Sequence, residues 1–304
     1  MGPYLSEEKF NWFSPLVFIL PLHVIPIFGI FFYPPTFRLL SLTIFVFFLI
    51  QGIGITLGYH RCLTHRSLEF RFKGIEYLFA TFGCLGLQKG PLWWCSIHRL
   101  HHQNSDTLHD PHNSKKGFLY SHFLWLAHLD PRWKNLLSDF REYQFKVEDL
   151  SSDPYYRWLD RYWYLPWFIF LGVLFILGRF SWVVWGGFVP FLYHYHSTWI
   201  VNSLCHKYGY RSFETKPLSD QSTNNWFSGI FSFGEGWHNN HHAFPSSAKH
   251  GFFRWWEFDM TYVIIWVLNK LGLISKLVIP TPETVKLKIL NLLSIEVTLQ
   301  KSLK

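Results

Sequence analysis

Four long runs without a charged residue dominate the pattern of apolar and polar positions along the chain. They cover residues 10–37, 39–60, 162–178 and 180–206. About 20 apolar residues of helix cross the roughly 30 Å hydrocarbon core of a bilayer, so each run is long enough to span it. The pattern therefore predicts membrane spans at about 14–33, 39–59, 162–178 and 181–203. Shorter apolar stretches such as 77–88 are expected in the membrane interface or the protein core.

The breaks between the runs are short, which predicts two helical hairpins. Arg38, just after Pro34 and Pro35, separates the first pair of runs, and Arg179 separates the second. Two hairpins place both termini and the long central segment on one side. Of the 28 Lys and Arg residues, only Arg38 and Arg179 lie in the two tips, so the positive-inside rule predicts that the other side is cytoplasmic.

We therefore expect an all-α integral membrane protein with four transmembrane helices. A cytoplasmic helical cap would comprise about 60–161 and 204–304. Because no internal repeat, low-complexity tract or flexible linker interrupts the chain, residues 1–304 are expected to form a single domain.

Composition supports a membrane protein. The chain is 49% hydrophobic, 21% aromatic and 16% charged, where an ordinary soluble domain carries about 25% charged residues. The net charge of +8 comes from basic residues that are spread along the chain without a dense run, which fits an anionic membrane leaflet and gives no expectation of nucleic-acid binding. The four cysteines form no CxxC pair, which favours a reduced compartment, and the N-terminus lacks the basic region of a secretory signal.

The 17 histidines cluster where the apolar runs reach the predicted cytoplasmic surface. The clusters are HRCLTH with His60 and His65, HRLHH with His98, His101 and His102, NSLCH with Asn202 and His206, and HNNHH with His238, His241 and His242. On an α-helix, the i, i+3, i+4 spacing of the two triples places all three imidazoles on one face. Each cluster is therefore expected to present converging nitrogen atoms.

This many histidines predicts a metal centre with two ions. Neutral imidazole is a ligand for Zn, Cu, Fe and Ni, and nine histidines with one amide exceed what a single ion binds. His60 and His65 are five residues apart, about 140° around a regular helix, so we expect the helix to end or bend there. No Glu-x-x-His pattern recurs, which disfavours a carboxylate-bridged helical-bundle site.

Several residues have simpler interpretations. Isolated histidines beside apolar runs are interpreted as hydrogen-bonded core or interface residues; these are His23, His122, His128, His194, His196 and His250. His109 and His112 either orient ligands or belong to a turn at Pro111. Asn202 is either a ligand or a helix-end residue, and the cysteines beside the clusters are expected to be small buried apolar residues.

Longer blocks around these clusters resemble a known family. GITLGYHRCLTHRS, HRLHHQNSDTLHDPHNSKKGF, WIVNSLCHKYGYR and FGEGWHNNHHAFPSSAKHG are similar to the signature blocks of integral-membrane fatty-acid desaturases of the stearoyl-CoA type, most closely the cyanobacterial acyl-lipid enzymes that act at carbon 9. The resemblance covers about residues 52–259. It implies a di-iron centre with the nine histidines above as ligands, and Asn202 as a ligand directly or through water.

The resemblance also implies a bent acyl tunnel enclosed by Gln88, Trp94 and Thr198, whose alternative roles are packing and interface anchoring. Two departures from the family pattern stand out. Leu108 replaces an Asp that members carry after SDT, and Leu129 and Asp130 stand where acyl-CoA members carry a basic pair. The second departure favours a lipid-linked acyl chain over acyl-CoA.

Removing two hydrogens from unactivated methylenes requires a redox-active metal, O2 and two electrons, which excludes zinc. The chain contains no dinucleotide-binding glycine pattern or Fe–S cysteine spacing, so a separate donor is expected. The resemblance to acyl-lipid enzymes implies a ferredoxin as this donor, whereas a resemblance to acyl-CoA enzymes would imply a small b-type cytochrome. We therefore expect a fatty-acid desaturase in a multi-pass location such as the thylakoid or plasma membrane of a cyanobacterium-like source, with both termini and the active site on the cytoplasmic side. A membrane di-iron hydroxylase or ketolase and a non-enzymatic metal or haem carrier are the alternatives.

Overall fold

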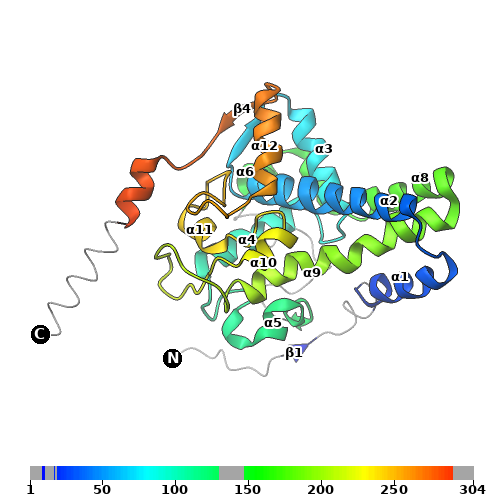
Figure 1. The fold of residues 1–304 in the computed structure, drawn as a ribbon, viewed down its shortest axis with the longest axis horizontal. Helices are drawn as coiled ribbons and strands as arrows, with labels where there is room; N and C mark the ends of the chain where they lie inside the picture. The colour runs from blue at the N-terminus through cyan, green and yellow to red at the C-terminus, as the bar shows by residue number, and fades with distance from the viewer. Residues whose placement is uncertain (1–8, 11–16, 18, 130–146, 290–304) are drawn as a thin grey trace, which may run out of the picture.

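The computed structural model describes residues 9–10, 17, 19–129 and 147–289, and this part of the chain is mostly helical (Figure 1). In chain order the elements are β1 (Lys9–Phe10), α1 (Leu20–Phe32), α2 (Phe37–Phe47), the π-helix η2 (Phe48–Thr64), β2 (Leu68–Phe70), α3 (Lys73–Cys84), α4 (Pro91–Asn104), η3 (Ser114–Lys116), α5 (Phe118–His122), η4 (Leu124–Leu126), β3 (His128–Leu129), α6 (Glu148–Ser151), α7 (Pro154–Arg161), α8 (Leu165–Trp182), η7 (Val183–Phe188), α9 (Val189–Leu204), α10 (Trp226–Phe231), α11 (His238–Ala243), α12 (Met260–Lys270) and β4 (Ile274–Leu277).

The described strands are short, and each pair links segments that are far apart in the sequence. β1 pairs with β3, and β2 pairs with β4, both antiparallel. The second pair joins residues just after η2 to residues just after α12. It therefore fixes the C-terminal part of the chain against the end of the helix that carries His60.

α2 and η2 form one continuous apolar helix from Phe37 to Thr64. Thr36 caps its start by accepting a hydrogen bond from the Leu39 backbone N–H at 3.3 Å. Gly54 allows the helix to cross α3 closely, because a Cβ at this position would lie 2.5 Å from the Phe82 backbone carbon. The predicted span 39–59 lies within this helix, which continues for a further turn and so carries His60 out of the apolar stretch.

The second apolar stretch runs from Leu165 to Leu204 through α8, η7 and α9. Its helical path breaks at Gly178 and Arg179, where Arg179 has a φ of 56°. Beyond the break the chain packs back on α8, since a Cβ at Gly187 would lie 2.3 Å from a methyl group of Leu171. The break falls at the residue predicted as a hairpin tip.

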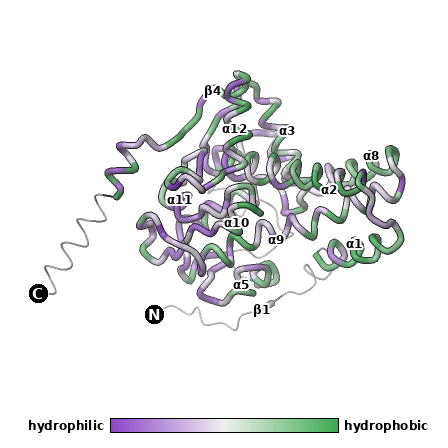
Figure 2. The backbone as a smooth tube through the Cα atoms, viewed as in Figure 1, coloured by the Kyte–Doolittle hydropathy of each residue, from purple (hydrophilic) through white to green (hydrophobic). Residues whose placement is uncertain are grey.

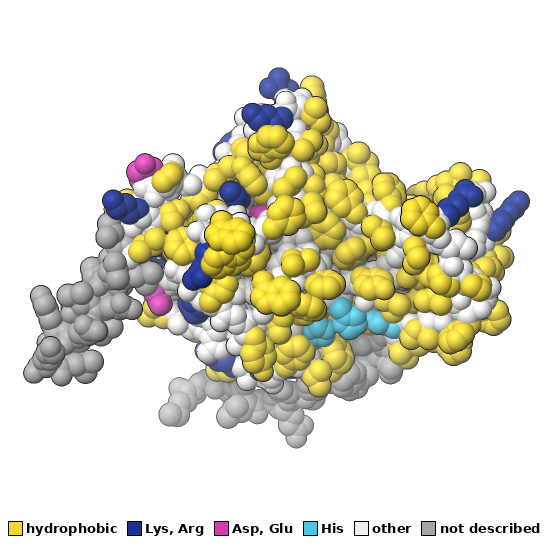
Figure 3. Space-filling view, in the orientation of Figure 1, with side chains coloured by type: hydrophobic (Ala, Val, Ile, Leu, Met, Phe, Trp, Pro, Cys, Tyr) yellow, Lys and Arg dark blue, Asp and Glu magenta, His cyan; other side chains and the backbone are white. Residues whose placement is uncertain are grey.

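α1, α2 and α8 lie at one end of the molecule, and many of their apolar side chains are exposed. Figure 2 shows that hydrophobic residues predominate along α1, α2 and α8. Figure 3 shows that hydrophobic side chains cover most of the surface at that end. Phe31, Phe32 and Phe37 are 79%, 78% and 88% exposed. Water-soluble surfaces rarely carry apolar patches of this extent, and Phe37–Thr64 and Leu165–Leu204 are each long and apolar enough to cross a membrane. Residues 14–16 and 18 of the first predicted span lie outside the described residues.

The opposite end buries the histidine clusters. A core that includes Leu57, Leu63, Leu92 and Leu159 packs η2 against α3, α4 and α7. α4 and α11 meet at the end of η2, as the ring contact between His102 and His241 shows. This meeting point carries the candidate site.

Candidate metal centre

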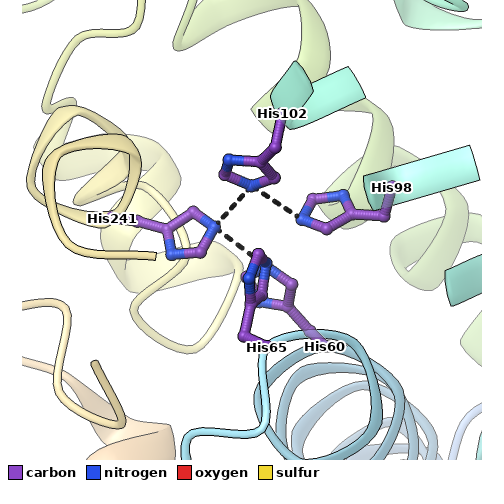
Figure 4. Close-up of side chains that lie close together, drawn as sticks. All are labelled: His60, His65, His98, His102 and His241. Carbon is purple, nitrogen blue, oxygen red and sulfur yellow. Dashed lines mark hydrogen bonds between the residues drawn. The ribbon is translucent and has the colours of Figure 1, made fainter. Parts of the chain in front are cut away.

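The nine predicted histidines come together as two adjacent groups. The first histidine group consists of His60, His65, His98, His102 and His241, and the second consists of His101, His206, His238 and His242. Within each group, one ring nitrogen from every member lies within 4.8 Å of the others. Figure 4 shows the imidazoles of the first group pointing toward one another from η2, α4 and α11. The sequence prediction of two ions matches this division into two groups.

α4 and α11 each contribute to both groups. On α4, His98 and His102 point to the first group, whereas His101 points to the second. On α11 the arrangement is reversed, with His241 in the first group and His238 and His242 in the second. The prediction that each triple presents a common face was therefore too simple, because the i, i+4 pair serves one group and the intervening histidine serves the other.

η2 brings His60 and His65 to the same group by its wide winding. The backbone N–H of His65 donates to the carbonyl of His60 at 3.1 Å, an i to i+5 hydrogen bond. In a π-helix, residues five apart lie roughly one turn from each other, so the 140° separation of a regular α-helix does not arise. The helix does end at Thr64, as expected, but the wide turn is what makes the two rings converge.

The spacing of nitrogens in the first group fits one metal ion. The Nε2 atom of His241 lies 3.1 Å from Nε2 of His60 and 2.9 Å from Nε2 of His102, which lies 3.1 Å from Nε2 of His98. Two nitrogens bound at about 2.1 Å and at right angles around one ion lie about 3 Å apart. In the second group, Nε2 of His206 and Nε2 of His238 are 3.0 Å apart.

Buried acceptors without partners also fit a metal. His65 Nε2, His101 Nε2 and His242 Nε2 are buried, and none has a hydrogen-bond partner within the described residues. A buried polar atom without a partner costs free energy, so each indicates a missing ligand. The residues present therefore fit two metal ions.

Four carboxylates that sequence analysis missed hold the Nδ1 side of these rings. Asp110 lies 3.0 Å from His101, Asp106 lies 2.8 Å from His206, Asp220 lies 3.0 Å from His242 and Glu235 lies 2.6 Å from His60. Such partners fix the orientation of a metal-binding imidazole and raise its basicity. Their position inside or beside the histidine blocks was a usable signal for Asp106, Asp110 and Glu235, whereas Asp220 is brought in by a separate loop.

Glu235 also belongs to a buried ion cluster. Arg61, with none of its surface exposed, donates to Glu235 at 2.9 Å and to Asp259 at 2.9 Å. Burial alone would raise the pKa of Glu235, but its interactions with the neighbouring His60 ring and with the Arg61 guanidinium hold it well below its usual range. The carboxylate thus stays ionised beside the first histidine group.

Electrostatics keep most of the histidines neutral. Burial, reinforced by neighbouring imidazoles, holds the pKa of His98, His102, His238 and His241 well below the usual value. The pKa of His242 falls to about 4 because burial outweighs Asp220. His206 differs: burial lowers its pKa, but the hydrogen bond and charge of Asp106 outweigh that and raise it. Neutral imidazoles are the form that binds metals.

A mostly apolar pocket with a cavity volume of about 110 Å³ reaches the first histidine group. His98 lines it together with the predicted substrate-contacting residues Gln88, Trp94 and Thr198 and with the half-buried Asn202. The Gln88 side chain donates to Thr198 at 3.0 Å and accepts from the Trp94 indole N–H at 3.1 Å. Three residues from separate parts of the chain therefore form one hydrogen-bonded set in the pocket wall.

Other predicted roles are resolved in part. His194 is buried and hydrogen-bonded to Gln51 at 2.7 Å, as expected of a core residue. His250 was interpreted in the same way, but it lies beside Glu235 at 3.4 Å and packs on His241, so it belongs to the surroundings of the first group. His112 packs on His101, whereas His109 is exposed. All four cysteines are free and buried.

Two of the three residues that depart from the family pattern, Leu108 and Leu129, lie in the described part of the chain. Leu108 is 81% exposed, so it makes no contact of the kind an aspartate would make in the site. Asp130 lies outside the described residues, and the described Leu129 belongs to β3.

Comparison with known proteins identifies the family. The family model for fatty acid desaturases matches residues 33–266, which contain every histidine of both groups. The chain belongs to the fatty acid desaturase family. It is 42% identical over 88% of its length to an sn-1 stearoyl-lipid 9-desaturase of Anabaena variabilis, 94% of which is covered. It is 39% identical over 91% of its length to an sn-2 palmitoyl-lipid 9-desaturase of Nostoc sp. (strain 36), again with 94% covered.

The family also contains relatives with another acyl carrier. The chain is 42% identical over 80% of its length to an acyl-CoA 5-desaturase of Anemone leveillei, of which it covers 72%. The predicted resemblance is confirmed, and the protein is a fatty-acid desaturase, an oxidoreductase acting on fatty acyl chains. Its histidine groups are compatible with the metal centre that this reaction requires.

Proposed function

We propose that this desaturase introduces a cis double bond at carbon 9 of a saturated, lipid-linked acyl chain, using two iron ions, O2 and two external electrons. The observation that carries the proposal is the apolar pocket that ends at the first histidine group. The cyanobacterial relatives named as stearoyl-lipid and palmitoyl-lipid 9-desaturases support the carbon position and the lipid carrier.

The proposed ligands are the nine histidines. His60, His65, His98, His102 and His241 would hold one iron, and His101, His206, His238 and His242 the other. Asn202, one helical turn before His206, would complete the centre directly or through water. Bound iron would supply the O2-dependent oxidation of an unactivated C–H bond, which zinc lacks the redox chemistry to perform.

The protein side chains bind and orient the acyl chain. Gln88, Trp94 and Thr198 form a hydrogen-bonded set in the pocket wall, and a bend of the acyl chain at this set would determine which carbon pair lies beside His98. One methylene of chain length is worth only about 1–3 kcal/mol in an apolar pocket, so a shaped wall selects position better than affinity does.

The atoms and electrons of the reaction balance with an external donor. The acyl chain loses two hydrogen atoms as the carbon–carbon single bond becomes a double bond. Two electrons from the donor and two protons from solvent, together with these hydrogens, reduce O2 to two waters. A ferredoxin fits a lipid-linked substrate, whereas a b-type cytochrome fits acyl-CoA.

We further propose four membrane spans in two hairpins, with the histidine groups and both termini on the cytoplasmic side of one domain, 1–304. Three features support this topology: the exposed apolar side chains of α1, α2 and α8, the helix break at Gly178 and Arg179, and the restriction of tip charges to Arg38 and Arg179. The parity of two hairpins then places the cap, about 60–161 and 204–304, beside the inner leaflet.

The test is fatty-acid analysis of a host that lacks its own desaturase. The chain is expressed with a ferredoxin system, and methyl esters of the intact glycerolipids are analysed by gas chromatography with double-bond localisation. We expect new carbon-9 monoenes that are absent with His101→Ala. Hydroxylated chains would replace this proposal with a hydroxylase, and an unchanged profile with verified iron and donor would contradict both and favour a metal carrier.

A further inference from the structure

A hollow in the surface reaches one member of the second histidine group, His206. His206, Lys207, Tyr208, Arg211 and Gln221 line it. His206 is only 1% exposed, whereas the side chains of Lys207, Tyr208 and Arg211 are exposed. The floor of the hollow is therefore a histidine whose Nε2 atom belongs to the second group, and the rim is available to a partner.

A short hydrogen-bonded route joins the wall of this hollow to the same histidine. The backbone N–H of Gln221 donates to Asp106 at 2.8 Å, and Asp106 lies 2.8 Å from Nδ1 of His206. One carboxylate thus separates the hollow wall from the imidazole. A redox centre placed over the hollow would be close to the second histidine group without any rearrangement of the core.

The rim of the hollow is positively charged. Lys207 and Arg211 line it, and Lys115 reaches the adjoining loop by donating to the Ser219 carbonyl at 3.4 Å. Arg211 is held in place by hydrogen bonds to the Asp220 carbonyl and the Thr215 hydroxyl, both at 2.8 Å. Lys216, on the same loop, is also exposed, and Glu214 is the exposed acidic residue between it and Arg211. Exposed basic side chains therefore outnumber exposed acidic ones on this loop.

Apolar groups beside the charges give the rim a second means of contact. Tyr208 is 60% exposed and Leu218 is 91% exposed. Transient redox complexes bury small interfaces and depend on charge complementarity for fast encounter. A basic rim with a few exposed apolar side chains fits that kind of partner. The rim begins at Lys207, just after the apolar helix ends at Leu204, and its side chains are exposed.

We propose that the electron donor, a small acidic protein with a one-electron redox centre, docks on this hollow, with Lys207 and Arg211 on its acidic surface. The proposal rests on the proposed function, which requires two external electrons for each double bond. Each docking oxidises one donor molecule by one electron, so two dockings serve one turnover, and O2 receives the electrons as balanced above.

The test measures binding separately from catalysis. Oxidised plant-type [2Fe–2S] ferredoxin, and in parallel the soluble domain of a b-type cytochrome, are titrated by calorimetry onto the detergent-solubilised full chain, iron-loaded and metal-free. Lys207→Glu is compared with Lys207→Gln and with Lys286→Glu, the same charge change at an exposed residue beyond β4. We expect Lys207→Glu to weaken donor binding about tenfold at low salt, Lys207→Gln to weaken it less, and Lys286→Glu to leave it unchanged. About 0.3 M salt should remove most of the difference.

Equal binding by wild type and Lys207→Glu, equal weakening by Lys286→Glu, or binding of neither donor to wild type would overturn the proposal. Iron content and thermal unfolding of each variant show whether the fold is intact. Because donor binding is also measured on the metal-free protein, it can be interpreted even if no desaturation is found. Donor binding that depends on Lys207 without double-bond formation would contradict the proposed function and would leave the docking site supported.

Discussion

Glu235→Gln tests whether the buried carboxylates tune the metal centre. Glu235 accepts from His60 Nδ1 at 2.6 Å and from Arg61 at 2.9 Å, and it is 6% exposed. Glutamine has nearly the same shape, so the substitution removes charge without creating a cavity. Losing such an orienting partner typically weakens metal binding about 10–100-fold, or about 1.4–2.7 kcal/mol.

The matched control is Asp259→Asn. Asp259 also accepts from Arg61, at 2.9 Å, and has similar burial, but it contacts none of the nine histidines. Removing one carboxylate from a buried ion cluster destabilises the fold by about 3 kcal/mol in either variant, because Arg61 loses half its compensation. Only Glu235→Gln should in addition weaken metal binding.

The assay is titration of the metal-free protein with Co²⁺, whose visible spectrum reports ligand binding, combined with iron analysis and thermal unfolding. We expect Glu235→Gln to lose affinity for one ion of two, with the second ion bound as in wild type. Wild-type affinity for both ions in Glu235→Gln would refute the reasoning, as would an equal loss in Asp259→Asn.

Three further predictions concern the two groups and the helix packing. His241→Ala and His238→Ala should each lower the iron content from about two toward one per chain by elemental analysis, and the double variant should lose both; loss of both ions in each single variant would contradict two separable groups. Chelation of iron from wild type should lower the midpoint of thermal unfolding, reversibly on adding Fe²⁺, because buried imidazole nitrogens are then left unpaired; an unchanged midpoint would argue against metal ligation. Gly54→Ala should destabilise the protein by about 1–3 kcal/mol because its Cβ would meet the α3 backbone at 2.5 Å, whereas Gly74→Ala, with nothing within 4 Å, should be neutral or stabilising by thermal unfolding; equal effects would refute the close crossing.

Much of the site was predictable because its chemistry is local in sequence. In HRLHH and HNNHH the three histidines lie within about one helical turn, so their proximity follows from the sequence alone. Histidine is also the residue type that supplies neutral nitrogen ligands for a metal. The apolar runs likewise predicted where long helices form, since helix length and hydropathy are properties of continuous segments. The break at Arg179 was also predictable, because a charged residue divides two apolar runs.

What the sequence left open depends on how segments pack. The division of each triple between two groups follows from the crossing of α4 and α11, which no spacing within one helix determines. The convergence of His60 and His65 required a π-helical winding that hydrophobic periodicity does not distinguish from a bent α-helix. Asp220 and Glu235 reach the histidines from loops 22 and 175 residues away from the rings they contact.

The sequence by itself therefore determined the ligand types, the apolar helices and the family resemblance. Only the tertiary structure decided which histidines lie together in one group, which carboxylates hold them, and where the second group approaches the surface beneath Lys207 and Arg211. The physical reason is range: ligand chemistry and helix formation depend on neighbours a few residues apart, whereas burial, charge pairing and access to the surface depend on contacts between segments far apart in the chain.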